Sequence, residues 1–143
     1  KAKEWLSITI NSFLSKDYTK ISIDDNIALE NIAAYIDDHY ATSISQKTLE
    51  KIAMMSGTKL KKLFKQKYQF TITEYTQRRR MNMAEILLLN SSLKIQDIAE
   101  AVGYSSHSKF SACFKRYKGI YPKDIKKYAS RENQLSNRVC TTK

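Results

Sequence analysis

The chain repeats one segment, and this duplication limits the folds available to it more than any other feature. Residues 45–68 and residues 94–118 each have the pattern of an apolar helix, a tight turn and a second helix rich in cations. The two copies align at matching positions: Leu49 with Ile98, Ser56 with Ser105 and, after one extra residue, Leu60 with Phe110. With three glycines and one proline there are few breaks that would favour short strands. The repeat therefore predicts an all-α fold built on two helix-turn-helix units.

Charge is distributed unevenly along the chain. Residues 1–44 carry four basic and seven acidic residues, whereas residues 45–90 carry ten and three, and residues 91–143 carry eleven and four. The excess positive charge, +11 over the whole chain, therefore belongs to the two repeats. Helix-turn-helix units with this charge predict a polyanionic partner, and duplex DNA in particular. A basic surface that serves only solubility is the alternative.

No cofactor, metal ion or membrane span is expected from the residue pattern. Cys113 falls on an apolar helical stripe and Cys140 in a polar segment, and neither has neighbours at metal-ligand spacing. The apolar run Ile86–Leu89 is far shorter than the ~20 residues of a membrane helix. The cysteine usage favours a reducing cytoplasm, where DNA binding would associate the protein with the nucleoid.

Apolar spacing and capping residues predict seven or eight helices. They are expected at about residues 2–15, 25–40, 46–54, 57–68, 72–90, 95–102, 106–118 and 122–129, with a polar tail over 130–143. Asp24 or Asp25 is expected to cap the second helix, and Thr71 with Glu74 forms a capping box before the fifth. That fifth helix would be about 28 Å long, close to the ~34 Å of one DNA turn. It would join the two units as a rigid connector.

The second half of the chain carries a long pattern with fixed spacing. It runs R-M-x-x-A-x-x-L-L from Arg80 to Leu88, then I-x-x-I-A-x-x-V-G-Y-S-S-x-S-x-F-x-x-x-F-K-x-Y-x-G-x-x-P from Ile95 to Pro122. In these positions the chain resembles the AraC/XylS family of bacterial transcription regulators, over about residues 26–129. The resemblance implies an all-α domain in which two helix-turn-helix units grip adjacent major grooves of duplex DNA.

The resemblance also implies partners. Domains of this family usually lie C-terminal to a separate domain that senses a signal and dimerises, and RNA polymerase is an expected partner. Because the chain begins with Lys1 and has no room for such a domain, it is expected to be a fragment. Residues 1–25 would then be an amphipathic helix and linker from the upstream regulatory domain. A homodimer of the full-length protein is a further expectation, with the apolar face near Trp5 as one way to form it.

Three residues of the first unit depart from the family pattern. Glu50 stands where a small residue is usual, and Met54 and Gln69 stand where glycine is usual. A non-glycine residue at positive φ costs about 1 kcal/mol. We therefore expect the first unit to be less tightly specified than the second, or to use a different turn. In the second unit Lys94 replaces the usual capping residue, where a cation is slightly unfavourable unless it reaches a phosphate.

The second helix of the first unit turns its apolar stripe inward and leaves a basic face outward. By the family's positions, the residues expected to read bases are Thr58, Lys61 and Lys62, and those expected to contact the DNA backbone are Lys59 and Lys65. A lysine can donate to guanine O6 and N7, and a threonine methyl can contact thymine. The alternative is that these lysines reach only phosphates.

In the second helix of the second unit, the family's base-reading positions fall on His107, Ser108, Ser111 and Ala112. These side chains are short apart from His107, so they reach base edges only if the helix lies deep in the groove, or through water. We therefore expect this half to have a looser sequence preference than the first. A solvated surface position is the alternative for His107.

Further residues are assigned to the DNA backbone, namely Ser45, Arg78, Lys94, Ser105, Ser106, Lys109 and Lys115. Those at the start of a helix lie beside free N–H groups, which favour phosphate. Arg80 matches an arginine of the family pattern and is expected to make a structural ion pair. A solvated face is the alternative for Arg78 and Arg79.

The function expected from these features is sequence-specific transcription regulation without catalysis. A protein that coats nucleic acid nonspecifically is the nearest alternative, but coating needs only charge and not a repeat. A protein-interaction module that kept the fold is another, against which the outward lysines argue. An enzyme would need a nucleophile–base pair, a glycine-rich phosphate loop or clustered carboxylates, and the sequence displays none of these patterns.

Overall fold

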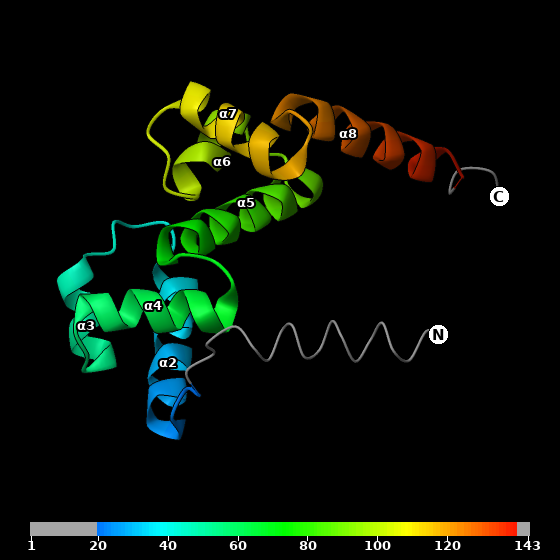
Figure 1. Ribbon diagram of the computed structural model, residues 1–143. Coiled ribbons are helices and arrows are strands. Elements are labelled where there is room, and N and C mark those ends of the chain that lie inside the picture. The colour runs from blue at the N-terminus through cyan, green and yellow to red at the C-terminus, as the bar shows by residue number, and fades with distance from the viewer. Residues whose placement is uncertain (1–19, 140–143) are drawn as a thin grey trace, which may run out of the picture.

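The computed structural model describes residues 20–139, and this part of the chain is helical without strands (Figure 1). Its helices are α2 (Ile23–His39), α3 (Gln46–Ala53), α4 (Gly57–Tyr68), α5 (Ile72–Asn90), α6 (Ile95–Ala101), α7 (His107–Lys118) and α8 (Pro122–Val139). The predicted all-α class and the two helix-turn-helix units, α3–α4 and α6–α7, are confirmed. The helix predicted over residues 2–15 lies outside the described residues.

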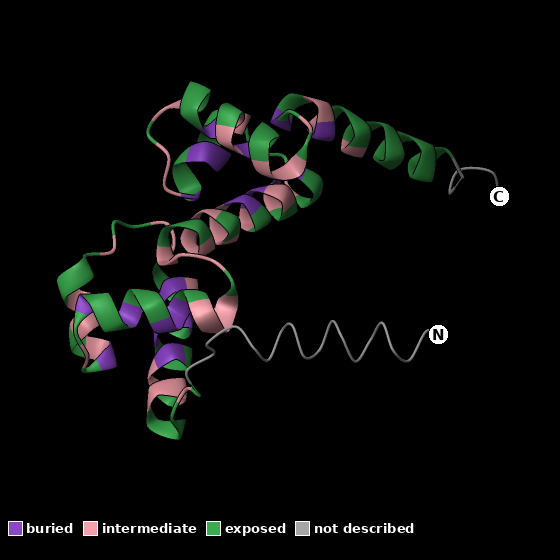
Figure 2. Cartoon of the chain, viewed as in Figure 1, coloured by how far each residue is buried: buried purple, intermediate pink, exposed green. Residues whose placement is uncertain are grey.

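Two separate hydrophobic cores hold the helices together, one for each unit (Figure 2). The first is formed by apolar side chains of α2, α3 and α4, with Phe64 fully buried. The second is formed by α5, α6, α7 and the start of α8, with Phe110 and Phe114 fully buried. Helix α5 lies between the two groups (Figure 1): Tyr75 near its start packs on the first core, and Met81 belongs to the second.

Side-chain caps explain where most helices begin. Ser45 Oγ accepts the backbone N–H of Thr48 at 3.1 Å, as predicted. Thr71 Oγ1 accepts the N–H of Glu74 at 3.2 Å while Glu74 accepts the N–H of Thr71 at 2.9 Å, which confirms the capping box. The expectation that Asp24 or Asp25 caps α2 is wrong, because Ser22 occupies that position. Lys94 precedes α6 without a side-chain cap.

Each unit has a left-handed residue in its turn and another after its second helix, although the residues differ. Met54 and Gln69 have φ values of 52° and 65°, and Gly103 and Gly119 have 93° and 77°. The first unit therefore keeps a left-handed residue in its turn, although this turn is one residue shorter than that of the second unit. The alignment needs one adjustment: Ser106, not Ser105, caps α7 as Ser56 caps α4, so the extra residue of the second unit lies in its turn.

The last helix continues well beyond the predicted end near Ala129. Helix α8 extends to Val139, and residues 130–138 are exposed, which Figure 2 shows as a green rod leaving the domain. The apolar pattern fades after Ile125, and the prediction, which relied on that pattern, therefore ended the helix too early. The segment nevertheless contains no glycine and, after Pro122, no proline, so nothing in the local sequence ends the helix.

Candidate nucleic-acid interface

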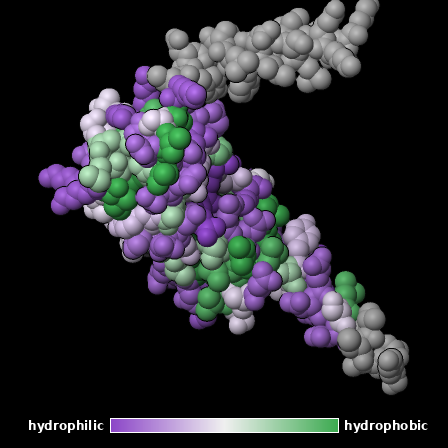
Figure 3. Space-filling model, turned by 90° about the horizontal axis from the view of Figure 1, so that it is seen from below, coloured by the Kyte–Doolittle hydropathy of each residue, from purple (hydrophilic) through white to green (hydrophobic). Residues whose placement is uncertain are grey.

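Helix α4 separates a buried side from an exposed basic side. Leu60, Leu63 and Phe64 are buried in the first core. The exposed side chains are those the sequence singled out: Thr58, Lys59, Lys61, Lys62 and Lys65. Seen from below, most of the molecule's visible surface is hydrophilic, and apolar colour is confined to separate patches (Figure 3).

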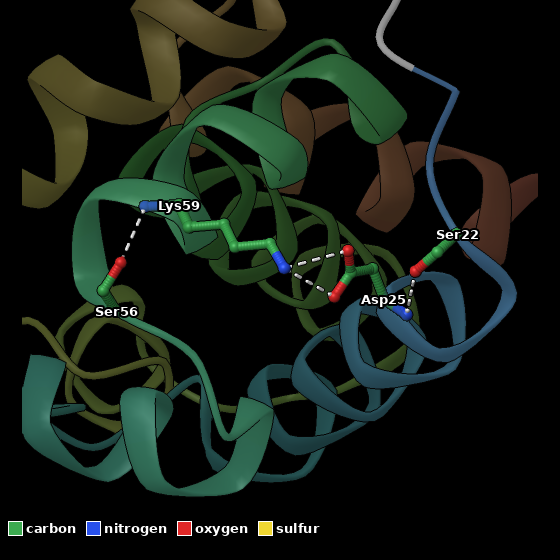
Figure 4. A network of polar contacts seen from close by, with 4 residues as sticks. All are labelled: Ser22, Asp25, Ser56 and Lys59. Carbon is green, nitrogen blue, oxygen red and sulfur yellow. Dashed lines mark hydrogen bonds and ion pairs between the residues drawn. The ribbon is translucent and has the colours of Figure 1, made fainter.

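Two lysines of α4 face carboxylates of α2, and Figure 4 shows one of these pairs, Lys59 with Asp25. Lys59 Nζ lies 3.1 Å from both carboxylate oxygens of Asp25, and Lys67 Nζ lies 3.0 Å from Glu30 Oε1. Asp25 is held in place by the start of α2, where its N–H donates to Ser22 Oγ at 3.1 Å. Lys59 therefore already has a partner, which a DNA phosphate would have to replace.

The outward lysines of α4 differ from those two. Within residues 20–139, no carboxylate forms an ion pair with Lys61 or Lys62, and both side chains are exposed. Their charges are thus available to a partner outside the domain. Lys59 and Lys67, which face α2, are therefore neutralised by carboxylates, whereas Lys61 and Lys62 are not.

Helix α7 presents a less charged outward face. His107, Ser108, Lys109 and Ala112 are exposed, whereas Ser111 is half-buried. Ser106 is engaged as the cap of α7, since its Oγ accepts the N–H of Lys109 at 3.4 Å. Ser105, just before it, is exposed.

Lys115 and Arg116 lie near the end of α7. Lys115 Nζ donates to the carbonyl of Gly119 at 2.8 Å and lies over the ring of Tyr121, so it serves the C-terminus of its own helix. Arg116, which sequence reasoning missed, is exposed and donates to Gln77 Oε1 at 3.4 Å. The sequence did hold a signal for Arg116, because this basic residue stands in the second repeat where the first repeat has the uncharged Gln66.

A shallow groove between α5 and the end of α7 gathers two arginines. It is lined by Glu74, Gln77, Arg78, Arg116 and Tyr117. The guanidinium of Arg78 lies 4.2 Å from the ring centre of Phe70 and 5.2 Å from that of Tyr117. The backbone N–H of Thr71 lowers the pKa of Glu74 below its ordinary value, with a smaller contribution from nearby cations, so Glu74 adds a negative charge to this groove.

The arginine that matches the family pattern, Arg80, has a structural role of a different kind from the one expected. It makes no ion pair within the described residues. Its guanidinium instead donates to three backbone carbonyls, those of Tyr40 at 2.6 Å, Thr42 at 3.1 Å and Gly103 at 3.3 Å. Arg80 thus donates to backbone carbonyls and not to a carboxylate. These carbonyls come together only in the folded domain, so the sequence did not indicate them.

Two further features bear on the range of partners. No helix among residues 20–139 is long and apolar enough to cross a membrane. In the same part of the chain, no group of three or more His, Cys, Asp or Glu side chains could hold a metal ion.

The chain is similar to known regulators and to solved DNA-binding domains. The helix-turn-helix domain family matches residues 49–128. The HTH-type transcriptional regulator YisR of Bacillus subtilis is 32% identical over 113 residues, or 79% of this chain and 39% of YisR. The HTH-type transcriptional activator RhaS of Escherichia coli is 27% identical over 126 residues, or 87% of this chain and 45% of RhaS. The chain thus spans less than half the length of these curated relatives.

Solved structures agree with the fold. The C-terminal domain of AraT, a response regulator from Geobacillus stearothermophilus, has a TM-score of 0.67 and 25% identity, covering 77% of this chain and 88% of that one. The DNA-binding domain of the transcriptional factor AdpA, solved with a target DNA, has a TM-score of 0.67 at 22% identity, covering 74% and 96%. With a family match over more than half of its length and a duplicated helix-turn-helix unit, the chain belongs to the AraC/XylS family of transcription regulators, and its described residues form the DNA-binding domain of that family.

Proposed function

We propose that this domain regulates transcription by reading a two-part promoter site, with α4 and α7 in successive major-groove segments of duplex DNA. One observation carries the proposal: two equivalent helices, each capped by a serine, turn unburied faces outward from duplicated units. Helix α5 joins the units and has 19 residues, or about 28 Å of rise. This length is comparable to the ~34 Å between half-sites one DNA turn apart.

In the first half of the site, α4 supplies most of the charge. Lys61 and Lys62, which have no carboxylate partner among residues 20–139, donate to guanine edges, and Thr58 contacts a thymine methyl. Lys65 contacts a phosphate. Lys59 adds a phosphate contact only where the DNA displaces Asp25.

In the second half, α7 reads with short side chains. His107, Ser108, Ser111 and Ala112 lie at the base-reading positions, and Ser111 is half-buried. We therefore expect weaker sequence preference in this half. A base-by-base mutational scan of the site measures it, and equal penalties in both halves would contradict it.

Backbone contacts complete the interface. The residues assigned to them are Ser45, Arg78, Lys94, Ser105, Ser106, Lys109 and Lys115. Exposure supports the roles of Lys94, Ser105 and Lys109. The bonds of Ser45, Ser106 and Lys115 to their own helices mean that these three would contact phosphate while still serving as caps.

The proposal extends to the whole protein. The domain acts by binding alone, without catalysis, in the cytoplasm and at the nucleoid. A sensor domain upstream of it receives the signal, a homodimer is the working form, and RNA polymerase is the protein partner. The regulators that match this chain, such as RhaS, are more than twice the length of the matched segment, which leaves room for such a domain in a relative of this kind.

Selection of the domain against a random DNA duplex library at ~150 mM salt tests the proposal, because nonspecific phosphate contacts weaken steeply with salt. Enrichment of a site with two short blocks about one helical turn apart supports a double helix-turn-helix reader. Binding without an enriched motif, lost as salt rises, would instead indicate charge-driven coating of nucleic acid.

A further inference from the structure

The two units are joined by α5, and they also contact each other directly at a junction beside it. The loop between α2 and α3 belongs to the first unit, and the turn between α6 and α7 belongs to the second. These segments lie against each other, and Tyr40 at the end of α2 packs against the second core. The first unit therefore reaches across α5 through its loop.

Arg80 fastens this junction from the middle of α5. Its Nε and Nη2 donate to the carbonyls of Tyr40 and Thr42 in the first unit, and its Nη1 donates to the carbonyl of Gly103 in the second. The planar guanidinium has donors in a fixed fork, so it can satisfy acceptors on both sides at once. A lysine has no such fork.

Gly103 shows how closely the two segments approach. A Cβ atom built on Gly103 would lie 2.5 Å from the carbonyl oxygen of Ala41, so no larger residue fits without movement of the loop. Gly119 has the same left-handed backbone, yet a Cβ built there meets nothing within 4 Å. The requirement for glycine at Gly103 therefore comes from the contact between units as well as from the turn.

The geometry points to a specificity role for Arg80: we propose that this junction, fastened by Arg80 and Gly103, sets the number of base pairs that the domain accepts between its two half-sites. The inference rests on the proposed function. One inserted base pair moves the second half-site by ~3.4 Å and turns it by about 35°. A rigid junction cannot follow that change, whereas a loosened junction can.

The expected dependence of affinity on spacer length follows from the linkage between two binding modules. A stiff connection gives the second module a high effective concentration at one spacing and almost none at others. When the connection is loosened, affinity falls at the preferred spacing and rises at the neighbouring ones. We expect the affinity of each unit for its own half-site to stay the same, because Arg80 donates to Tyr40, Thr42 and Gly103 and to none of the side chains assigned to bases.

The experiment measures affinity for the selected site with the spacer changed by −2 to +2 base pairs, and for each half-site alone. The variants are Arg80→Lys and Gly103→Ala, and Gly119→Ala is the matched control because it strains the same backbone without touching the other unit. For Arg80→Lys we expect about tenfold weaker binding at the preferred spacing, a partial loss of the ~10²–10⁴-fold gain that linkage of two modules gives, and a flatter spacing profile. Gly119→Ala should keep the sharp wild-type profile.

A second measurement needs no DNA and is made on variants that melt as cooperatively as the wild type. Spin labels at Lys47→Cys in α3 and Gln96→Cys in α6, in a Cys113→Ser and Cys140→Ser background, report the distance between the units. We expect Arg80→Lys to broaden this distance distribution.

The outcomes separate the two proposals. A wild-type domain with no spacing optimum would overturn the proposed function and this inference together. A clear wild-type optimum that stays equally sharp in Arg80→Lys and Gly103→Ala would overturn the inference alone.

Discussion

The two helix-turn-helix units place left-handed backbone at equivalent points with different residues. The first places Met54 and Gln69 in left-handed conformations, where the second has Gly103 and Gly119. Each unit nevertheless packs α3 or α6 against its recognition helix around a buried phenylalanine. The comparison indicates that core packing holds the turns in place. The residue at the turn changes only the backbone strain, which is larger for Met54 and Gln69 than for glycine.

The surfaces of the two units diverge more than their cores do. Lys61 and Lys62 of α4 correspond to Ser111 and Ala112 of α7, counted from the capping serines. The cores keep aromatic and aliphatic residues at the matching positions. A duplicated unit can thus keep its fold while its two copies take on unequal shares of binding.

Removing a core phenylalanine tests whether the units are independent, and it has the largest expected effect. Phe64→Ala and Phe114→Ala each remove a fully buried ring and should lower the free energy of unfolding by about 3–5 kcal/mol. Urea unfolding measures this loss, and amide exchange locates it. We expect Phe64→Ala to expose α2–α4 first. Equal loss of protection in α6–α8 would mean that the domain unfolds as one unit.

Neutralising the outward lysines tests the difference in charge between the recognition helices. The double substitution Lys61→Ala with Lys62→Ala should weaken DNA binding by about 2–4 kcal/mol and lower the salt slope by about 2. Fluorescence anisotropy at several salt concentrations gives both quantities. The matched Ser111→Ala removes one hydroxyl and should change affinity by no more than about 1 kcal/mol. Unchanged affinity in the double variant would favour a protein-interaction module instead.

Restoring glycine to the first unit tests the difference in strain. Met54→Gly relieves a positive φ, and Met54 is 91% exposed, so little packing is lost. We expect the free energy of unfolding to rise by about 1 kcal/mol, and by a similar amount for Gln69→Gly. Thermal denaturation measures the gain. A loss of stability would show that these side chains make favourable contacts that outweigh the backbone strain.

The smallest expected effect concerns the capping box at the start of α5, where the first unit ends. The bond from the Thr71 N–H lowers the pKa of Glu74 below its ordinary 4.5. This stabilisation is therefore present above pH 4.5 and is lost as the pH falls through the lower folded pKa. Glu74→Gln keeps an acceptor without titrating, so its stability difference from wild type should shrink in acid. A pH series of thermal melts checks this, and a constant difference would contradict it.

Local sequence predicted the helices well because their signals lie within a few residues. Thr71 and Glu74 are three positions apart, and the prediction of α5 over residues 72–90 is confirmed at both ends. The same local reasoning failed for α8, because it equated the end of the apolar stripe with the end of the helix. A solvent-exposed helix has no such stripe to follow.

Partners distant in sequence were out of reach of this reasoning. Lys59 meets Asp25 across 34 positions, and Arg80 meets carbonyls 40, 38 and 23 positions away. The family pattern singles out Arg80, but it does not indicate which acceptors lie beside Arg80 in the folded domain. The expected ion pair was wrong for this reason.

The amino-acid sequence by itself determined the repeat, the caps, the inward faces and the basic character of α4, because each depends on residue type and short-range periodicity. Only the tertiary structure decided which lysines are neutralised, how the two units meet and where Arg80 donates its hydrogen bonds. Those outcomes depend on groups far apart in the sequence, carboxylates for the lysines and backbone carbonyls for Arg80, and only the packed chain brings particular ones together.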